Sequence, residues 1–155
     1  MKKLLIIICI LFSLPFLLIG CLRLYGIVTN HTLHSQIFRF VDENEQELTA
    51  IAKGQMNGTN HDEFFLGVRI EGVYTGEHPI VQFYYDGTGL APSSCYYGFY
   101  YSPDDAPAAY DNNTHWRAEQ RGDSEWIYHD PAKGSDNGGR TIRITKYWFY
   151  YEAWF

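Results

Sequence analysis

The sequence has few cysteines, and only one of them lies in the part of the chain that we expect to fold as a domain. Cys9 lies inside an apolar run and Cys21 at its end, which leaves Cys95 alone among residues 35–155. One cysteine cannot form a disulfide within that domain, so the chain is not a disulfide-stapled scaffold. A nucleophilic role for Cys95 is disfavoured because neither a histidine partner nor an elbow turn surrounds it, and we expect a small buried apolar group.

Clusters of basic residues are also lacking. The chain has 12 Lys and Arg against 18 Asp and Glu, a net charge of −6. Residues 1–20 contain two lysines and no acid, so the remainder of the chain carries −8. A domain of this charge repels nucleic acid and anionic lipid headgroups, and we expect neither as a partner.

Metal-binding spacings are missing as well. The six histidines form no H-x-x-x-H or H-E-x-x-H pattern, and the cysteines form no C-x-x-C pair. Histidine stands beside carboxylates at 61–63 and 129–130, but both stretches read as loops or strand ends. The acidic loops at 104–105 and 130–137 lack the alternating carboxylates of a calcium loop. We therefore expect no metal and no other cofactor.

Acid–base catalysis has four candidate side chains, which are His78, Asp104, Asp105 and Glu152. The two aspartates follow Ser-Pro, a context that favours a turn or the cap of a short helix over 106–110. Glu152 lies among aromatic residues, where a buried carboxylate requires a partner such as Arg140 or Arg143. None of the four forms a catalytic motif. We expect a domain that is not an enzyme, with a small envelope enzyme as the alternative.

Aromatic residues, in contrast, are abundant. The chain has 4 Trp, 13 Tyr and 10 Phe, and nineteen of these rings fall between residues 83 and 155. Large rings favour strands and bury much area per residue, so the second half of the chain predicts a β-rich core.

The N-terminus predicts an export segment. Lys2 and Lys3 precede Leu4–Ile19, sixteen residues without a charge, which is the pattern of a secretory signal. The run Leu18-Ile19-Gly20-Cys21 resembles the bacterial lipoprotein consensus, which implies cleavage before Cys21 and lipid attachment to its thiol. Alternatively, residues 4–22 form an uncleaved transmembrane helix, since nineteen residues suffice to cross about 30 Å of hydrocarbon. Both interpretations place the domain on the extracytoplasmic face of the cell membrane.

Past the anchor (1–21) and a tether (22–34), residues 35–155 predict a single domain of the α+β class. Apolar or neutral residues recur at helical spacing from Ile37 to Gln55, and Asn57-Gly58 is a helix stop. A strand at 36–41 is the alternative for the start of this segment. The rest predicts about five antiparallel strands, which lie at 64–74, 80–85, 95–101, 125–129 and 140–154. A helix packed on such a sheet would be a cystatin-like arrangement.

Three stretches of the domain resemble a group of small N-terminally anchored proteins of Gram-positive gut bacteria. They are GVYTGEHPIVQFYY (72–85), CYYGFYYSPDDAPAAYDN (95–112) and RITKYWFYYEAWF (143–155). The resemblance covers most of residues 35–155. It implies a bacterial origin and an extracytoplasmic domain, and it implies no activity.

Aromatic side chains are the best candidates for ligand contact. We expect Tyr97, Phe99, Trp148 and Tyr150 to form the core. Four rings nearer to loops and termini are the candidates for contact with a sugar or a protein, and these are Tyr110, Trp116, Trp126 and Trp154. The sequence thus predicts a membrane-anchored binding module that faces an envelope glycan or a protein partner.

Overall fold

A long helix is the first element of the fold. The computed structural model describes residues 32–90 and 93–155, and residues 32–56 are helical. The described helix therefore includes residues 32–34 of the predicted tether, and the alternative strand at 36–41 is wrong. It ends as expected at Asn57, whose amide bonds to the carbonyl of Lys53 at 3.0 Å, and Gly58 follows with φ 67°. The predicted anchor, including Cys21, lies outside the described residues, and within these no helix is long and apolar enough to span a membrane.

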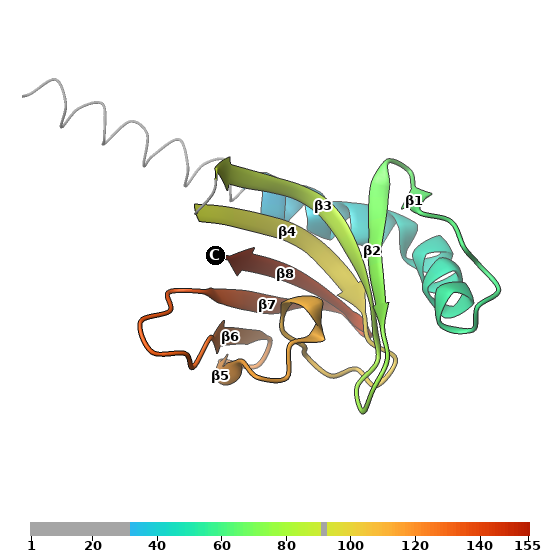
Figure 1. Ribbon diagram of the computed structural model, residues 1–155. Helices are drawn as coiled ribbons and strands as arrows, with labels where there is room; N and C mark the ends of the chain where they lie inside the picture. Colours follow the sequence, from blue (N-terminus) through green and yellow to red (C-terminus); the bar gives the residue numbers. More distant parts are fainter. Residues whose placement is uncertain (1–31, 91–92) are drawn as a thin grey trace, which may run out of the picture. The chain divides into compact units, whose positions relative to one another are not determined.

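The second part of the chain forms one antiparallel sheet of eight strands (Figure 1). The strands are β1 (Phe64–Phe65), β2 (Val68–Tyr74), β3 (Ile80–Leu90), β4 (Ser93–Tyr101), β5 (Arg117–Arg121), β6 (Glu125–His129), β7 (Gly138–Thr145) and β8 (Trp148–Trp154). Their order in the sheet is β1-β2-β3-β4-β8-β7-β6-β5. One helix with an antiparallel sheet confirms the predicted architecture, whereas the prediction of about five strands is wrong.

Tight turns account for most of the additional strands. The predicted strand at 64–74 is two strands, because Leu66 and Gly67 form a turn with φ 47° and 85°. The predicted strand at 140–154 is likewise divided by a turn in which Tyr147 has φ 71°. Only glycine adopts a positive φ readily, so nothing in the types of Leu66 and Tyr147 signals these turns. The remaining strand is β5, whose polar sequence RAEQR lacks the alternation that marks a half-buried strand.

The helix covers one face of the sheet and builds the larger core against it. The rings of Phe83 and Phe99 stack with centroids 4.9 Å apart, and Phe40 of the helix packs on Phe99 at 5.8 Å. The indole Nε1 of Trp148 donates to Oγ1 of Thr49 at 3.2 Å. The four rings that the sequence predicts as core are all buried, namely Tyr97, Phe99, Trp148 and Tyr150.

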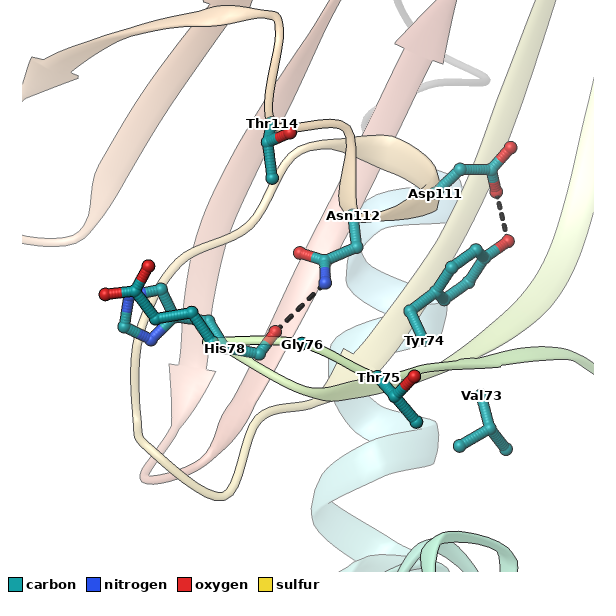
Figure 2. A pocket seen from close by; sticks show the side chains of 9 residues that line it. Val73, Tyr74, Thr75, Gly76, His78, Asp111, Asn112 and Thr114 are labelled. Atoms are coloured by element: carbon teal, nitrogen blue, oxygen red, sulfur yellow. Dashed lines mark hydrogen bonds between the residues drawn. The ribbon is translucent and has the colours of Figure 1, made fainter.

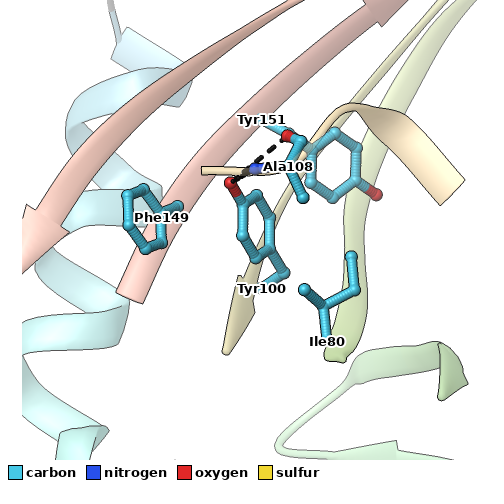
Figure 3. Close-up of a cluster of buried hydrophobic side chains, with 5 residues drawn as sticks. All are labelled: Ile80, Tyr100, Ala108, Phe149 and Tyr151. Carbon is cyan, nitrogen blue, oxygen red and sulfur yellow. Dashed lines mark hydrogen bonds between the residues drawn. The ribbon is translucent and has the colours of Figure 1, made fainter. Parts of the chain in front are cut away.

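The opposite face of the sheet has a core of its own (Figure 3). Side chains alternate between faces along a strand, so Tyr100 and Phe149 project away from the helix, and their rings stack 5.2 Å apart. The segment between β4 and β5 covers them. Its Ala108 is buried, with the amide donating to the Tyr100 hydroxyl at 2.6 Å. Thr141 donates its hydroxyl to the Ala108 carbonyl at 2.8 Å. A segment that the sequence presents as a polar loop is therefore a packed layer.

Asp105 fastens the start of this segment to the sheet. Its carboxylate accepts the amide of Tyr147 at 2.8 Å and pairs with the guanidinium of Arg143. Burial alone would raise the pKa of Asp105, but the Tyr147 amide and Arg143 outweigh it and lower the pKa. The expected helix over 106–110 is absent from this described segment, which contains only the 3-10 turn η1 (Tyr110–Asn112). The expected turn is present, and Asp105 closes it, with φ 55° and its amide donating to the Ser102 carbonyl at 3.0 Å.

Candidate functional site

A group of polar side chains surrounds the carboxylate of Glu71 beside the second core. Glu71 is 14% exposed, and its Oε2 accepts hydrogen bonds from Nε2 of Gln82 at 2.7 Å and from the hydroxyl of Tyr151 at 3.0 Å. Its Oε1 accepts the hydroxyl of Tyr110 at 3.1 Å. The fully buried amide of Gln82 also reaches Asp111, with Nε2 3.1 Å from Oδ1 and Oε1 accepting the Asp111 amide at 3.0 Å. One buried amide thus joins the two carboxylates and fixes η1 against the sheet.

Three tyrosines donate their hydroxyl protons to these two carboxylates. Tyr110 and Tyr151 donate to Glu71, and Tyr74 donates to Oδ1 of Asp111 at 2.6 Å. Burial first, and then the neighbouring carboxylates, raise the pKa of all three hydroxyls. The tyrosines therefore stay protonated near neutral pH and act as fixed donors, which is a structural role rather than one of proton transfer.

On the same face, aromatic rings form a continuous surface, here called the ring surface. Phe64, Arg69 and Tyr84 pair across β1, β2 and β3, so their side chains project from one face. The guanidinium of Arg69 lies 5.0 Å from the centre of the Tyr84 ring. The ring of Tyr84 lies 6.4 Å from that of Tyr96, which stands 5.8 Å from Phe155. Tyr110 and Trp116 extend the surface, at 5.7 Å and 5.9 Å from Phe155.

The ring surface contains a pocket of about 450 Å³. Its lining is mostly aromatic and consists of Phe64, Gly67, Arg69, Tyr84, Tyr85 and Tyr96. Phe64 is 59% exposed, which is unusual for a large apolar side chain. Ligand sites in proteins combine apolar walls with a few polar groups that fix orientation. Here the tyrosine hydroxyls and the guanidinium supply those groups.

A second pocket, of about 440 Å³, lies where the turn between β2 and β3 faces η1 (Figure 2). Its lining includes His78, and Asn112 donates its side-chain amide to the His78 carbonyl at 3.0 Å. Asp111 and Asn112 have φ 53° and 52°, a conformation that asparagine and aspartate tolerate better than most residues. Nδ1 of His78 lies 3.4 Å from Oδ2 of Asp104, and these side chains are 57% and 45% exposed. Both side chains are thus well exposed to solvent, whereas a catalytic dyad usually lies in an enclosed site.

The four ring residues predicted as ligand contacts do not form one site. Tyr110 and Trp116 both belong to the ring surface. Trp126 packs edge-on against Phe149 at 6.1 Å, at the margin of the second core. Trp154 alternates onto the other face of β8. All four are half-buried, and two of them lie together on the ring surface, whereas contact with a ligand stays a prediction for each.

The other candidate residues lie apart. Glu152 lies opposite Arg140 across β8 and β7, while the guanidinium of Arg140 forms its ion pair with Glu125, at 2.7 Å. Burial raises the pKa of Glu152, and Arg140 offsets part of that rise. Burial also raises the pKa of the Cys95 thiol, which disfavours the nucleophilic thiolate. Among residues 32–90 and 93–155, no three His, Cys, Asp or Glu side chains are placed to hold a metal ion.

Sequence reasoning missed the residues at the centre of the ring surface, Phe64, Arg69, Tyr84 and Tyr96. The signal available was the alternation of Tyr84 with Phe83 and of Tyr96 with Tyr97, which places a ring on both faces of β3 and β4. Phe64 could not be placed, because its position depends on the turn at Leu66. The chain matches no family model, no curated protein and no solved structure, so its function has to be argued from this geometry.

Proposed function

We propose that this protein is a binding module of the bacterial cell envelope that holds a neutral glycan against the ring surface. The observation that carries the proposal is the row of rings from Phe64 to Trp116, with a pocket at one end. Flat rings pair with the apolar faces of sugars, and tyrosine hydroxyls bond to sugar hydroxyls. A surface of this kind binds without a catalytic group.

The charge of the site favours a neutral ligand. Arg69 is the only basic residue in the pocket lining, and Glu71 lies 3.4 Å from its guanidinium. The two charges compensate each other, and the chain as a whole is acidic. Anionic polymers would meet net repulsion, whereas a polar uncharged sugar would not.

The extent of the ring surface favours an oligosaccharide over a single sugar. Three successive ring contacts of 5.8–6.4 Å connect Tyr84 to Trp116 through Tyr96 and Phe155. A longer glycan would contact more of these rings than a single sugar would. We therefore expect affinity to increase with the length of the sugar chain.

The proposal is tested with the full-length chain in detergent, titrated calorimetrically with N-acetylglucosamine oligomers of two to six units. We expect Phe64→Ser and Tyr84→Ala each to weaken binding about tenfold, equivalent to ~1.4 kcal/mol. Leu66→Ser is the matched control, because Leu66 is 67% exposed beside Phe64 but does not line the pocket. Equal binding by Phe64→Ser and Leu66→Ser, or no binding by the natural chain, would contradict the proposal.

We also propose that the domain stands outside the cytoplasm, held by its N-terminus. The motif at 18–21 supports lipid attachment at Cys21, and the apolar run 4–22 supports an uncleaved helix. Incorporation of radiolabelled palmitate that is lost in Cys21→Ser would identify the lipoprotein. Membrane retention of both proteins without label would identify the helix.

The alternative, an envelope enzyme, depends on the pocket beside η1. The pair His78–Asp104 and the carboxylate of Asp111 are the groups that favour it. Hydrolysis of a cell-wall or peptide substrate that is lost in both His78→Ala and Asp111→Asn would establish this function. Activity unchanged in these variants would exclude a role for the pocket.

A further inference from the structure

The outer edge of β2 is open over its second half. β1 pairs only with Val68 and Arg69, and one further backbone bond joins the Ile70 amide to the Glu63 carbonyl at 2.8 Å. Within residues 32–90 and 93–155, no strand pairs with the outer side of β2 at 71–74. An unpaired strand edge is a template for another strand.

This edge lacks the protection that the opposite edge of the sheet has. The outer strand there is β5, whose residues are all exposed and include Arg117, Glu119 and Arg121. Charged side chains of this kind discourage pairing with a further strand. On β2, Val73 is 38% exposed instead, and large apolar side chains exposed to this extent are rare in the described parts of the chain. The bulge at Glu71 limits regular pairing to the residues that follow it.

Acidic groups stand beside the open edge. Both hydrogen bonds received by the Asp111 carboxylate end on Oδ1, and the second oxygen points away from Tyr74 (Figure 2). Glu77 lines the same pocket, and the only side chain there that can carry a positive charge is His78. A residue added opposite Tyr74 would project its side chain from the same face as Asp111.

We propose that the β2 edge binds an extended peptide segment of a partner protein, in which apolar and cationic residues alternate. The apolar side chain would contact Val73, and the cationic side chain opposite Tyr74 would pair with Asp111. This inference does not depend on glycan binding, which uses other residues.

The test uses a capped heptapeptide of alternating valine and lysine with the full-length chain in detergent. We expect saturable binding that weakens with added salt, together with slower amide exchange in residues 72–74. The same heptapeptide with glutamate in place of every lysine should bind at least about tenfold more weakly. The valine–lysine peptide methylated on every backbone amide keeps its charge but cannot pair, and it should not bind. This comparison leaves the protein itself unchanged.

A pair of variants locates the site. Asp111→Asn should weaken the valine–lysine peptide about fivefold, since asparagine tolerates the backbone conformation of Asp111 but removes its charge. Asp123→Asn removes the same charge from the exposed turn after β5 and should have no effect. Equal weakening by both variants, binding of the methylated peptide, or exchange protection outside β2 would overturn the proposal. So would concentration-dependent protection of both β2 and β5 without peptide, which would identify a second copy as the occupant.

Discussion

The two faces of the sheet use the same residue types for different purposes. On the face under the helix, rings pack with other rings, as Phe83 does with Phe99 at 4.9 Å. On the opposite face, rings carry hydroxyls that bond to carboxylates, as Tyr110 and Tyr151 do with Glu71. The first face is a core of closely packed rings. The second combines a core with a polar network and the ring surface, so the candidate site lies where aromatic residues are only partly covered.

Aromatic residues are thus abundant in this chain for two reasons. β8 lies between β4 and β7 and is covered on both sides, so it needs a ring at nearly every position. Gly98 of β4 is the necessary gap, because a methyl group there would collide with the Phe83 carbonyl and the ring of Tyr151. Rings outside these packed positions, such as Phe64 and Tyr84, have no equivalent structural need. Four substitutions, two on each face, should show how differently the two faces contribute to stability.

The first prediction concerns the face of the sheet under the helix. Phe99→Ala removes a fully buried ring that stacks on Phe83 and contacts the helix through Phe40. We expect a loss of about 3–5 kcal/mol in the free energy of unfolding, measured with urea. Val73→Ala, on the same face but exposed, should change stability by less than about 1 kcal/mol. Similar values for the two variants would contradict a tightly packed core under the helix.

The second prediction concerns the polar network. Glu71→Ala leaves the hydroxyls of Tyr110 and Tyr151 and the amide of Gln82 without their acceptor. We expect urea unfolding to show a loss of about 2–4 kcal/mol, because buried donors without acceptors are costly.

A double-mutant cycle of Glu71→Ala with Tyr151→Phe tests this account of the network. The effects should be less than additive by about 1 kcal/mol, since either change breaks the same bond. Strictly additive effects would show that Glu71 and Tyr151 do not act together.

The third prediction concerns Asp105 on the loop-covered face. Its pKa in the folded protein is lowered, so its stabilisation is present above the ordinary value of about 3.9 and is lost as pH falls through the folded value. Asp105→Asn should therefore lower stability near pH 6, by less than about 1 kcal/mol because the pair is partly solvated. Measured by urea unfolding, the difference in stability between Asp105→Asn and the natural chain should disappear well below pH 4. A difference that persists at low pH would point to the backbone turn rather than to the charge.

The fourth and smallest prediction concerns Glu152, which alternates onto the face under the helix. Its pKa is raised by burial, so the native state favours the protonated form and loses stability as pH rises through the ordinary Glu value toward the folded one. Glu152→Gln should raise the urea midpoint slightly at pH 7 and have no such effect at pH 3. A lower midpoint at pH 7 would show that pairing with Arg140 outweighs the burial cost.

Local patterns in the sequence were sufficient to predict the helix and most of the buried core residues. The helical spacing from Ile37 onward and the stop at Gly58 both appear in the structure, and Phe99 and Trp148 are buried as predicted. The number of strands could not be predicted, because the turns at Leu66 and Tyr147 place side-chain-bearing residues in a conformation that favours glycine. Those conformations are held by contacts that form only in the folded sheet, such as the bond from the Tyr147 amide to Asp105.

The hydrophobic N-terminal segment, the acidic charge, the helix and the aromatic-rich sheet all follow from composition and periodicity, which act locally along the chain. Which rings became core and which formed a surface depends instead on how the strands pair. Tyr110 reaches Tyr96 and Phe155 only when β4 and β8 pair, and Glu71 meets Tyr151 only across β2, β3, β4 and β8. Contacts between residues so far apart along the chain depend on strand order and register, which no local pattern specifies.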